Sequence, residues 1–387
     1  QEVKNSNDVV ISNPYSVPSG TPTEVAIDMM IENNVSSVII DDGKFKGILP
    51  LTSLTFQNIE GTDVDEFMIP VEEAITASYK ITPEQAKEIM KENQVGKLPL
   101  LDEEANVKGL VTRKDLFKSQ DYPQATLDNN GRYVVGGAIG INDDYIERAQ
   151  KLIEAEVDFL VVDIAHGDSF NCIDAIVQIK QLWDIPVMAG NVATKEGVRR
   201  LYHAGVDAVK IGVGPGSICT TRIVTGHGVP QLSAILDCAD LKGLNIPLIA
   251  DGGIRTSGDI VKALAAGASS VMLGSLLAGT EEAPGDFIHK NGTRFKMVRG
   301  MASYGAALGR NKRAGDKINS ATPEGVEGLV PYRGYAEEVI SNLMGGVRSG
   351  FSYTGAITME DLWAKSKFMK ITQAGMRESN SHDISTL

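Results

Sequence analysis

The sequence predicts an α/β protein whose larger part is a parallel sheet covered by helices, and three observations support this prediction. From about residue 132 onward, apolar segments of strand length alternate with helical segments, the pattern of parallel strands buried on both faces. Each apolar segment ends in polar or glycine residues, as strands do at the active-site edge of a (β/α)8 barrel. The chain also contains 40 glycines, consistent with many tight turns between strands and helices.

Six strands are expected in this part of the chain, at residues 132–140, 158–166, 185–192, 207–212, 246–253 and 270–275. Helices are expected between them, including residues 194–204 and 257–266, and another begins near Gln231. A closed (β/α)8 TIM barrel needs eight βα units, so six of eight are visible. A doubly wound sheet is the structural alternative, but its dinucleotide-binding fingerprint is missing.

Residues 1–120 are expected to form a separate domain built from a repeat, joined by a polar linker at 118–125 to residues 121–387. Each copy has a helix that starts at Thr-Pro, then an apolar strand, a polar turn, and a second strand that begins with glycine and ends in threonine. The helices start near residues 21 and 82, since proline is favoured in the first turn of a helix.

This order, which occurs twice, resembles a tandem pair of CBS domains. In that family the aspartate of a Thr-x-x-Asp stretch holds a ribose, so the resemblance implies adenine or guanine nucleotides as ligands. The second copy keeps Thr112 and Asp115, whereas the first has Thr52 but Leu54 and Phe56 where the acid would fall. A purely structural or dimerising pair is the alternative.

Composition excludes several classes of function. The net charge of −13 argues against nonspecific nucleic-acid binding, which needs a basic face. No apolar run approaches the roughly 20 residues that span a bilayer, so no membrane association is expected. The three cysteines, Cys172, Cys219 and Cys238, are odd in number and lack metal-type spacing, which favours a reducing, cytoplasmic compartment.

The segment GPGSICTTR at residues 214–222 is the strongest candidate for a catalytic loop. It follows an expected strand, and its glycines allow backbone amides to approach an anionic ligand. Cys219 lies in this loop beside two threonines and Arg222, surroundings that favour the nucleophilic thiolate. Cys172 and Cys238 are expected to be packing residues in helices.

Several further segments, together with this loop, resemble IMP dehydrogenases: GHGVPQ (226–231), ADGGIR (250–255), MLGS (272–275), EAPG (282–285), RGM (299–301) and RES with HD (377–383). That family is a (β/α)8 barrel with a CBS pair inserted after the second helix, which accounts for the domain order and for the two units not visible. The resemblance implies NAD-dependent oxidation of IMP to XMP in guanine nucleotide biosynthesis.

The resemblance also implies roles for individual residues. Cys219 is the nucleophile that adds to the purine, Thr221 helps to place the water, and Arg313 is the base in an active-site flap at about 305–330. Ala314 replaces the tyrosine that follows this arginine in the family. The residues implied to hold the substrate are Ser217, Asp251, Gly252, Gly253, Gly274, Ser275, Met301 and Glu324. Those implied on the NAD side are Asp163, Asn191, Gly212 and Gly214.

A potassium ion is implied as well. In the family, carbonyl groups of the cysteine loop and of a neighbouring subunit's tail hold it, which implies a homotetramer. The corresponding residues here are Gly214, Gly216 and Cys219 in the loop and Glu378, Ser379 and Asn380 in the tail.

Two other functions stay open. A GMP reductase, which uses NADPH, shares the barrel and the cysteine loop, but that family carries a glutamate where this chain has Tyr304. This chain instead keeps the Pro-Glu-Gly stretch at 323–325 that is typical of the dehydrogenases. A catalytically impaired nucleotide-sensing homologue is the third possibility, favoured by Ala314 and by Val298 at a position where a tyrosine is expected.

Overall fold

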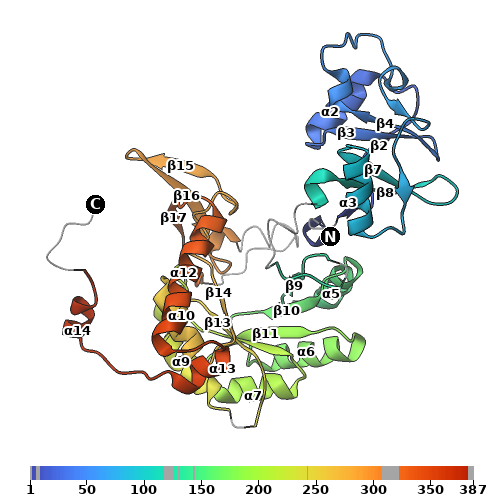
Figure 1. The fold of residues 1–387 in the computed structure, drawn as a ribbon. Helices are drawn as coiled ribbons and strands as arrows, with labels where there is room; N and C mark the ends of the chain where they lie inside the picture. Colours follow the sequence, from blue (N-terminus) through green and yellow to red (C-terminus); the bar gives the residue numbers. More distant parts are fainter. Residues whose placement is uncertain are drawn as a thin grey trace. The chain divides into compact units, whose positions relative to one another are not determined.

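The computed structural model describes residues 2–5, 9–116, 125–129, 131–142, 144–241, 243–306 and 322–381. The chain forms two compact units (Figure 1). The first comprises Gln1–Val135 with Ala155–Val157, and the second comprises Gly136–Glu154 with Asp158–Leu387. Most of the expected linker lies outside the described residues.

The first unit contains two four-stranded sheets built in the same way. The first has the order β2-β3-β4-β5, formed by Ser16–Val17, Ser37–Asp41, Phe45–Pro50 and Ile69–Pro70. The second has the order β6-β7-β8-β1, formed by Ala77–Ser78, Lys97–Leu101, Val107–Thr112 and Val10–Ile11. In both sheets the first pair of strands is parallel and the other pairs are antiparallel. The strand that precedes each copy, β1 or β5, therefore completes the sheet of the other copy.

Helices α2 (Thr23–Glu32) and α3 (Pro83–Glu92) begin in the expected Thr-Pro segments. Thr82 and Gln85 form a reciprocal capping box on α3, which stabilises its first turn. The short elements of this unit are α1 (Glu2–Asn5), η1 (Leu51–Leu54) and η2 (Val64–Glu66).

Each copy has its own apolar core, and a third cluster joins them. Met30 and Leu49 are fully buried in the first copy, as are Leu98 and Leu100 in the second. The joining cluster consists of Ile39, Phe45, Ile48 and Leu110. Because this cluster takes residues from both sheets, the two copies share one buried interface.

The second unit is built on a sheet of six parallel strands. Their order is β14-β13-β12-β11-β10-β9, formed by Ser270–Met272, Leu248–Asp251, Ala208–Ile211, Val187–Val192, Phe159–Asp163 and Gly136–Ile139. The spatial order follows the chain order without reversal, as in the wall of a barrel. A doubly wound sheet reverses its strand order, so the described strands exclude that alternative. The predicted parallel α/β architecture is confirmed.

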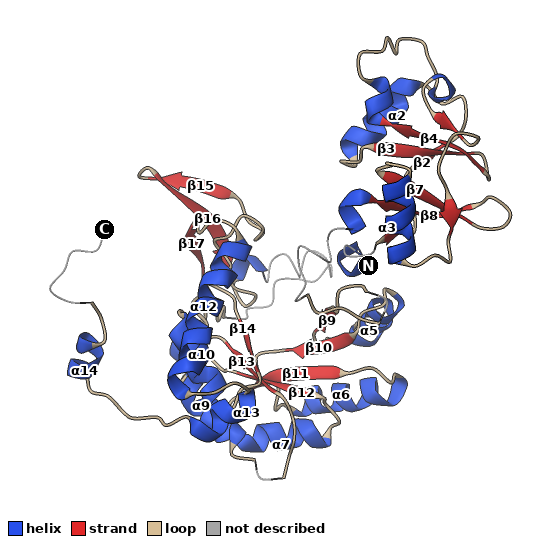
Figure 2. Ribbon diagram, viewed as in Figure 1, coloured by secondary structure: helices blue, strands red, loops and turns tan. Residues whose placement is uncertain are grey.

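Helices lie along the sheet of the second unit, and Figure 2 shows α6, α7, α9 and α10 on its outer side. The helices that follow the strands are α5 (Tyr145–Glu154), α6 (Phe170–Leu182), α7 (Lys195–His203), α9 (Gln231–Ala239), α10 (Ser257–Ala265) and α12 (Ala336–Thr354). The hydroxyl oxygens of Thr194 and Thr256 accept backbone amides at the starts of α7 and α10, so both helices begin close to the expected residues. A short α8 (Thr221–Thr225) follows the cysteine loop, and α13 (Met359–Lys365) packs against α10.

An antiparallel sheet that the sequence did not predict lies between β14 and α12. Its strands are β15 (Phe287–Lys290), β16 (Thr293–Arg299) and β17 (Glu327–Pro331). The Arg294 guanidinium of β16 lies 3.9 Å from the ring centre of Phe287 in β15 and 4.6 Å from that of Tyr332, the residue after β17, so it makes cation–π contacts on both sides. The strand β17 falls within the expected flap, whereas Arg313 and Ala314 lie outside the described residues.

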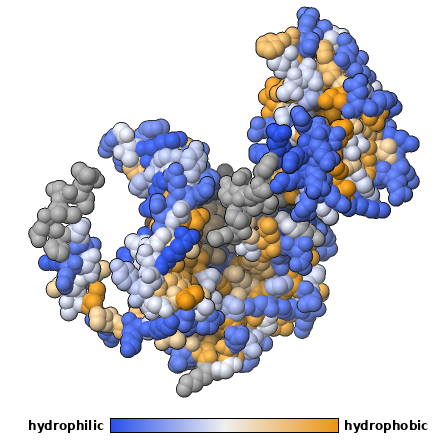
Figure 3. Space-filling model, in the orientation of Figure 1, coloured by the Kyte–Doolittle hydropathy of each residue, from blue (hydrophilic) through white to orange (hydrophobic). Residues whose placement is uncertain are grey.

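The chain then leaves the sheet, and α14 (Gln373–Glu378) is the last helix among the described residues. The segment that leads to α14 carries exposed apolar side chains, including Met369, 84% exposed, and Ile371, 60% exposed (Figure 3). Across the described ranges, no helix has both the length and the apolar character needed to cross a membrane.

Candidate active site

Four predicted residues lie at the carboxyl ends of neighbouring strands. Asp163 ends β10, Asn191 lies near the end of β11, Gly212 follows β12 and Asp251 ends β13. Because carboxyl ends of parallel strands meet at one edge, residues far apart in the sequence come together here. The Asn191 side-chain nitrogen Nδ2 donates to Asp251 Oδ2 at 3.0 Å and to the Gly212 carbonyl at 2.7 Å.

Lys210, which the sequence analysis missed, lies at the centre of this edge. Its side chain is 2% exposed, and its Nζ is 2.9 Å from Asp163 Oδ1 and 2.5 Å from Asp251 Oδ2. A fully buried lysine is rare unless it is paired. The signal that could have found it is a lysine in the otherwise apolar segment AVKI of an expected buried strand.

A thiol and a hydroxyl of the cysteine loop and a carboxylate from a later segment are linked by two successive hydrogen-bond contacts. Cys219 Sγ lies 3.2 Å from the Thr221 hydroxyl oxygen, and that hydroxyl donates to Glu324 Oε2 at 2.7 Å. The pair of Thr221 and Glu324 can therefore pass a proton from a group near Cys219 to a carboxylate. The sequence analysis named all three residues, with Glu324 as a contact of the substrate.

Backbone pairing fixes Glu324 beside the loop. The Thr220 amide donates to the Glu324 carbonyl at 2.8 Å, and the Val326 amide donates to the Ile218 carbonyl at 3.0 Å. Cys219 and Gly325 form an isolated antiparallel bridge between the two segments. This short ladder holds residues 324–326 against the cysteine loop, so the relay does not depend on side-chain packing alone.

The environment of the other two cysteines separates them from Cys219. Cys172 in α6 and Cys238 in α9 are buried, as expected for packing residues. Burial raises the pKa of Cys172 to about 11 and that of Cys238 to about 12. Both thiols are therefore neutral at pH 7, whereas Cys219 is partly exposed to solvent. Among the three cysteines, Cys219 is the one that a ligand can reach.

Glycines allow the loops after β12 and β13 to approach closely. Gly212 has a φ of +148°, and a Cβ atom there would collide with the Asp251 carbonyl oxygen. At Gly252, with a φ of +88°, a Cβ atom would lie 3.0 Å from the Pro215 ring and 3.3 Å from the Gly216 nitrogen. Side chains at these positions would push the cysteine loop away from Asp251.

The remaining predicted substrate residues lie in the loops around this edge. Ser217 is exposed in the cysteine loop, and Gly274 and Ser275 begin the turn after β14, whose amides at 277 and 278 donate to the Gly274 carbonyl. Met301 is 77% exposed just after β16. Its neighbour Gly300 donates to the Val326 carbonyl at 3.1 Å, which links this turn to the segment that carries Glu324.

The predicted potassium ligands are in two separate places within one chain. In the loop, the Gly216 carbonyl accepts the Cys219 amide at 3.1 Å. In the tail, Ser379 and Asn380 hydrogen-bond backward to α14, at 2.8 Å and 3.0 Å. No cluster of three His, Cys, Asp or Glu side chains with metal-binding geometry occurs in the described residues.

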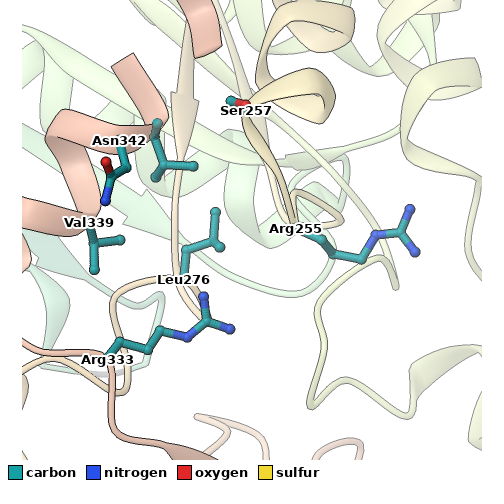
Figure 4. Close-up of a pocket in the computed structure, with 7 residues that line it drawn as sticks. Arg255, Ser257, Leu276, Arg333, Val339 and Asn342 are labelled. Carbon is teal, nitrogen blue, oxygen red and sulfur yellow. The ribbon is translucent and has the colours of Figure 1, made fainter. Parts of the chain in front are cut away.

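A cavity of about 430 Å³ lies elsewhere in the second unit, between α10, α12 and the loop after β14 (Figure 4). Its lining residues are Arg255, Ser257, Leu276, Arg333, Val339, Asn342 and Leu343. None of them belongs to the predicted site. The polar groups converge instead at the open strand edge, where Asp163, Asp251 and Cys219 lie.

A sheet of parallel strands covered by helices, with a reachable thiol, a hydroxyl–carboxylate pair and two further carboxylates at its carboxyl edge, is typical of α/β enzymes. A family model described as "IMP dehydrogenase / GMP reductase domain" matches residues 4–382. The chain therefore belongs to the IMP dehydrogenase/GMP reductase family, and its curated relatives make it an NAD-dependent oxidoreductase.

Relatives named for each of the two activities are similar in sequence to this chain over nearly its whole length. The inosine-5'-monophosphate dehydrogenase of Aquifex aeolicus is 48% identical over 99% of this chain and 80% of its own length. That of Nitrosopumilus maritimus is 45% identical, with 99% and 82% covered. The GMP reductase of Leishmania major is 42% identical, with 100% and 82% covered.

A solved structure is similar in fold as well as in sequence. It is a cysteine-to-alanine variant of GMP reductase from Trypanosoma brucei in complex with guanosine 5'-monophosphate. It matches this chain with a TM-score of 0.93 and 39% identity, covering 99% of this chain and 82% of that one.

Proposed function

We propose that the chain oxidises IMP to XMP with NAD through a covalent intermediate on Cys219, in guanine nucleotide biosynthesis. The observation that carries this proposal is the row formed by Cys219, Thr221 and Glu324 at the carboxyl edge of the sheet. The dehydrogenase relatives, at up to 48% identity, support the same direction of reaction.

In the first step, the Cys219 thiolate adds to C2 of the purine and forms a carbon–sulfur bond. The hydrogen on C2 then leaves with its electron pair, so the purine carbon is oxidised and a thioimidate remains on Cys219. NAD supplies the acceptor for this hydride. The loop contributes access, because Cys219 is partly exposed whereas the other thiols are buried.

The residues on the dinucleotide side fit NAD. Asn191 Oδ1 is buried and has no hydrogen-bond partner among the described residues, so it can accept an N–H such as that of a carboxamide. The Asp163 carboxylate is 50% exposed, and its acceptors suit hydroxyl groups of a ribose. Gly212 and Gly214, which complete the predicted set, allow close approach to the backbone.

In the second step, water attacks C2, the carbon–sulfur bond breaks and the Cys219 thiolate is released. The Thr221 hydroxyl can take a proton from the water as it donates its own proton to Glu324. Arg313 remains the proposed second base, and it lies outside the described residues. The contact at 2.7 Å makes Thr221 and Glu324 a proton path that does not require Arg313.

The nucleotide itself would be held by residues around the same edge. The free oxygen of the Asp251 carboxylate suits a ribose diol, because an ionised carboxylate accepts from both hydroxyls. The amides of Gly252, Gly253, Gly274 and Ser275, with Ser217, suit a phosphate. Met301 and Glu324 would contact the purine.

The oligomer, the ion and the first unit belong to the same proposal. A homotetramer is supported by the exposed apolar segment before α14, which suits contact with a neighbouring subunit. Glu378, Ser379 and Asn380 of that neighbour would then complete a potassium site with Gly214, Gly216 and Cys219. The first unit, as a CBS pair, would bind a purine nucleotide at Asp115, whose carboxylate the Thr112 hydroxyl fixes at 2.5 Å. The closed eight-unit barrel and a cytoplasmic location are proposed on the family resemblance.

GMP reductase is the second candidate, supported by the Leishmania relatives and the Trypanosoma structure. The test is to incubate the protein with IMP plus NAD and, separately, with GMP plus NADPH, and to follow the absorbance of the reduced cofactor. An increase in that absorbance with IMP and NAD supports the proposal. A decrease with GMP and NADPH, without an increase in the first mixture, supports the reductase. No change in either mixture would favour a catalytically impaired homologue.

A further inference from the structure

Lys210 joins two carboxylates that belong to different parts of the proposed site. Asp163 ends β10, and Asp251 ends β13, two strands that are not neighbours in the sheet. The ammonium lies 2.9 Å from the first carboxylate and 2.5 Å from the second. One buried cation therefore holds the dinucleotide-side carboxylate and the ribose-side carboxylate in a fixed relation.

The sheet is shaped to keep the lysine in this position. Lys210 pairs with Gly190 on the neighbouring strand, where a Cβ atom would lie 2.5 Å from Lys210 Cβ. Gly190 therefore leaves the space that the lysine side chain occupies. The side chains of Val209 and Ile211 point to the opposite face of the strand, so Lys210 alone of the three extends toward the polar cluster.

The contacts also leave acceptors for ligands. Lys210 and Asn191 both donate to Oδ2 of Asp251, and no described residue hydrogen-bonds its Oδ1. The carboxylate of Asp251 is 23% exposed and that of Asp163 is 50% exposed, while the lysine side chain between them is 2% exposed. The cation is thus buried beside two partly exposed carboxylates, each of which has an oxygen that Lys210 does not contact.

We infer that Lys210 is a positioning residue for both ligands: it orients Asp251 toward the ribose of the purine nucleotide and Asp163 toward the dinucleotide. It touches neither ligand in this role, and it acts by keeping two like charges at one edge without mutual repulsion. This inference rests on the proposed function, because it assigns the two carboxylates to the two ligands of that reaction.

The test replaces Lys210 by Met, which keeps the chain length and removes the charge. Loss of charged hydrogen bonds should raise the KM for IMP and the KM for NAD about tenfold or more each. Lys210→Arg keeps the charge and should recover most of the affinity for both. The matched control is Lys180→Met, since Lys180 pairs with Asp207 at 3.1 Å at the amino end of β12. That variant should leave both KM values unchanged.

A compensated variant separates positioning from simple charge balance. Lys210→Met combined with Asp163→Asn removes one charge of each sign, so its thermal unfolding temperature should return toward that of the unmodified protein. If Lys210 orients Asp251, the Kd for IMP in isothermal titration stays raised in this double variant. A Kd equal to that of the unmodified protein would overturn the inference, because Lys210 would then only balance charge.

The binding measurement also distinguishes this inference from the proposed function. If the unmodified protein binds IMP but transfers no hydride to NAD, the proposed reaction fails while the titrations still decide the role of Lys210. If GMP binds in place of IMP, the same variants are compared with GMP. Unchanged nucleotide affinity in Lys210→Met would refute the inference under either outcome.

Discussion

Replacing Glu324 by Gln should separate the two steps of the proposed reaction. Glutamine keeps the shape of the side chain and can still accept the Thr221 hydroxyl, but it cannot take the proton over the 2.7 Å contact. A positioned general base contributes about 10² to 10⁴ in rate. Because Arg313 offers a second path, we expect the lower end, about 100-fold, which corresponds to about 2.7 kcal/mol in the barrier to hydrolysis.

The assay is rapid mixing with IMP and NAD, followed through the absorbance of the reduced cofactor. We expect a burst of about one reduced cofactor per active site at an unchanged rate, since Glu324 takes no part in hydride transfer, and then a steady state slowed about 100-fold. Glu337→Gln, an exposed position on α12, is the control and should change neither phase. An unchanged steady state in Glu324→Gln would refute the proton path, and loss of the burst at saturating IMP would show that Glu324 is already needed before hydrolysis.

Three further predictions follow from other parts of the structure. At pH 7, a 6-chloropurine ribotide should label Cys219 alone, because burial raises the pKa of Cys172 to about 11 and that of Cys238 to about 12. A labelled Cys172 or Cys238 peptide in mass spectrometry would contradict this prediction. Exchange of sodium for potassium should raise activity, and deletion of the tail after Met376 should remove that response; a full response in the truncated protein would exclude the tail ligands. Burial lowers the pKa of Lys97 to about 8 in the folded protein, whereas the pKa of an unfolded lysine is about 10.4. Between these two pH values the unfolded state binds more protons, so the free energy of unfolding should rise with pH. Lys97→Met should remove that rise in urea midpoints measured at pH 8 and pH 10, and an identical pH dependence in both proteins would show that the burial has no such effect.

Much of the fold could be predicted because local signals coincide with the element ends. The threonine before α7 and the threonine before α10 accept backbone amides of the first helical turn, so the polar residue in the sequence marks the real start of the helix. The cysteine loop was predictable for a similar reason, since Gly214 in this loop has a φ of +82°, a conformation that favours glycine. In both cases the chemistry is local in the sequence.

The parts that could not be predicted depend on contacts between distant segments. The role of Lys210 can be recognised only in the folded structure, where β10 and β13 place Asp163 and Asp251 beside it. Neither carboxylate is near Lys210 in the sequence. The antiparallel sheet brings Arg294 over the rings of Phe287 and Tyr332, a contact that no periodicity of the short strands indicates. The strand β17 lies at the end of the expected flap, where the sequence analysis assigned no strand.

The exchange of edge strands in the first unit has a consequence for how that unit folds. Val10 of β1 pairs with Val111 of β8, so the second sheet contains strands from both ends of the unit. The first sheet is completed by β5, which follows the first copy in the sequence. Loop closure over such a span must precede the pairing, which slows folding relative to a local hairpin. An isolated copy would expose the edge that its partner's strand normally covers, and an exposed edge promotes aggregation. During synthesis, therefore, the second sheet stays incomplete until both copies have left the ribosome, and the two copies reach the native state as one cooperative body.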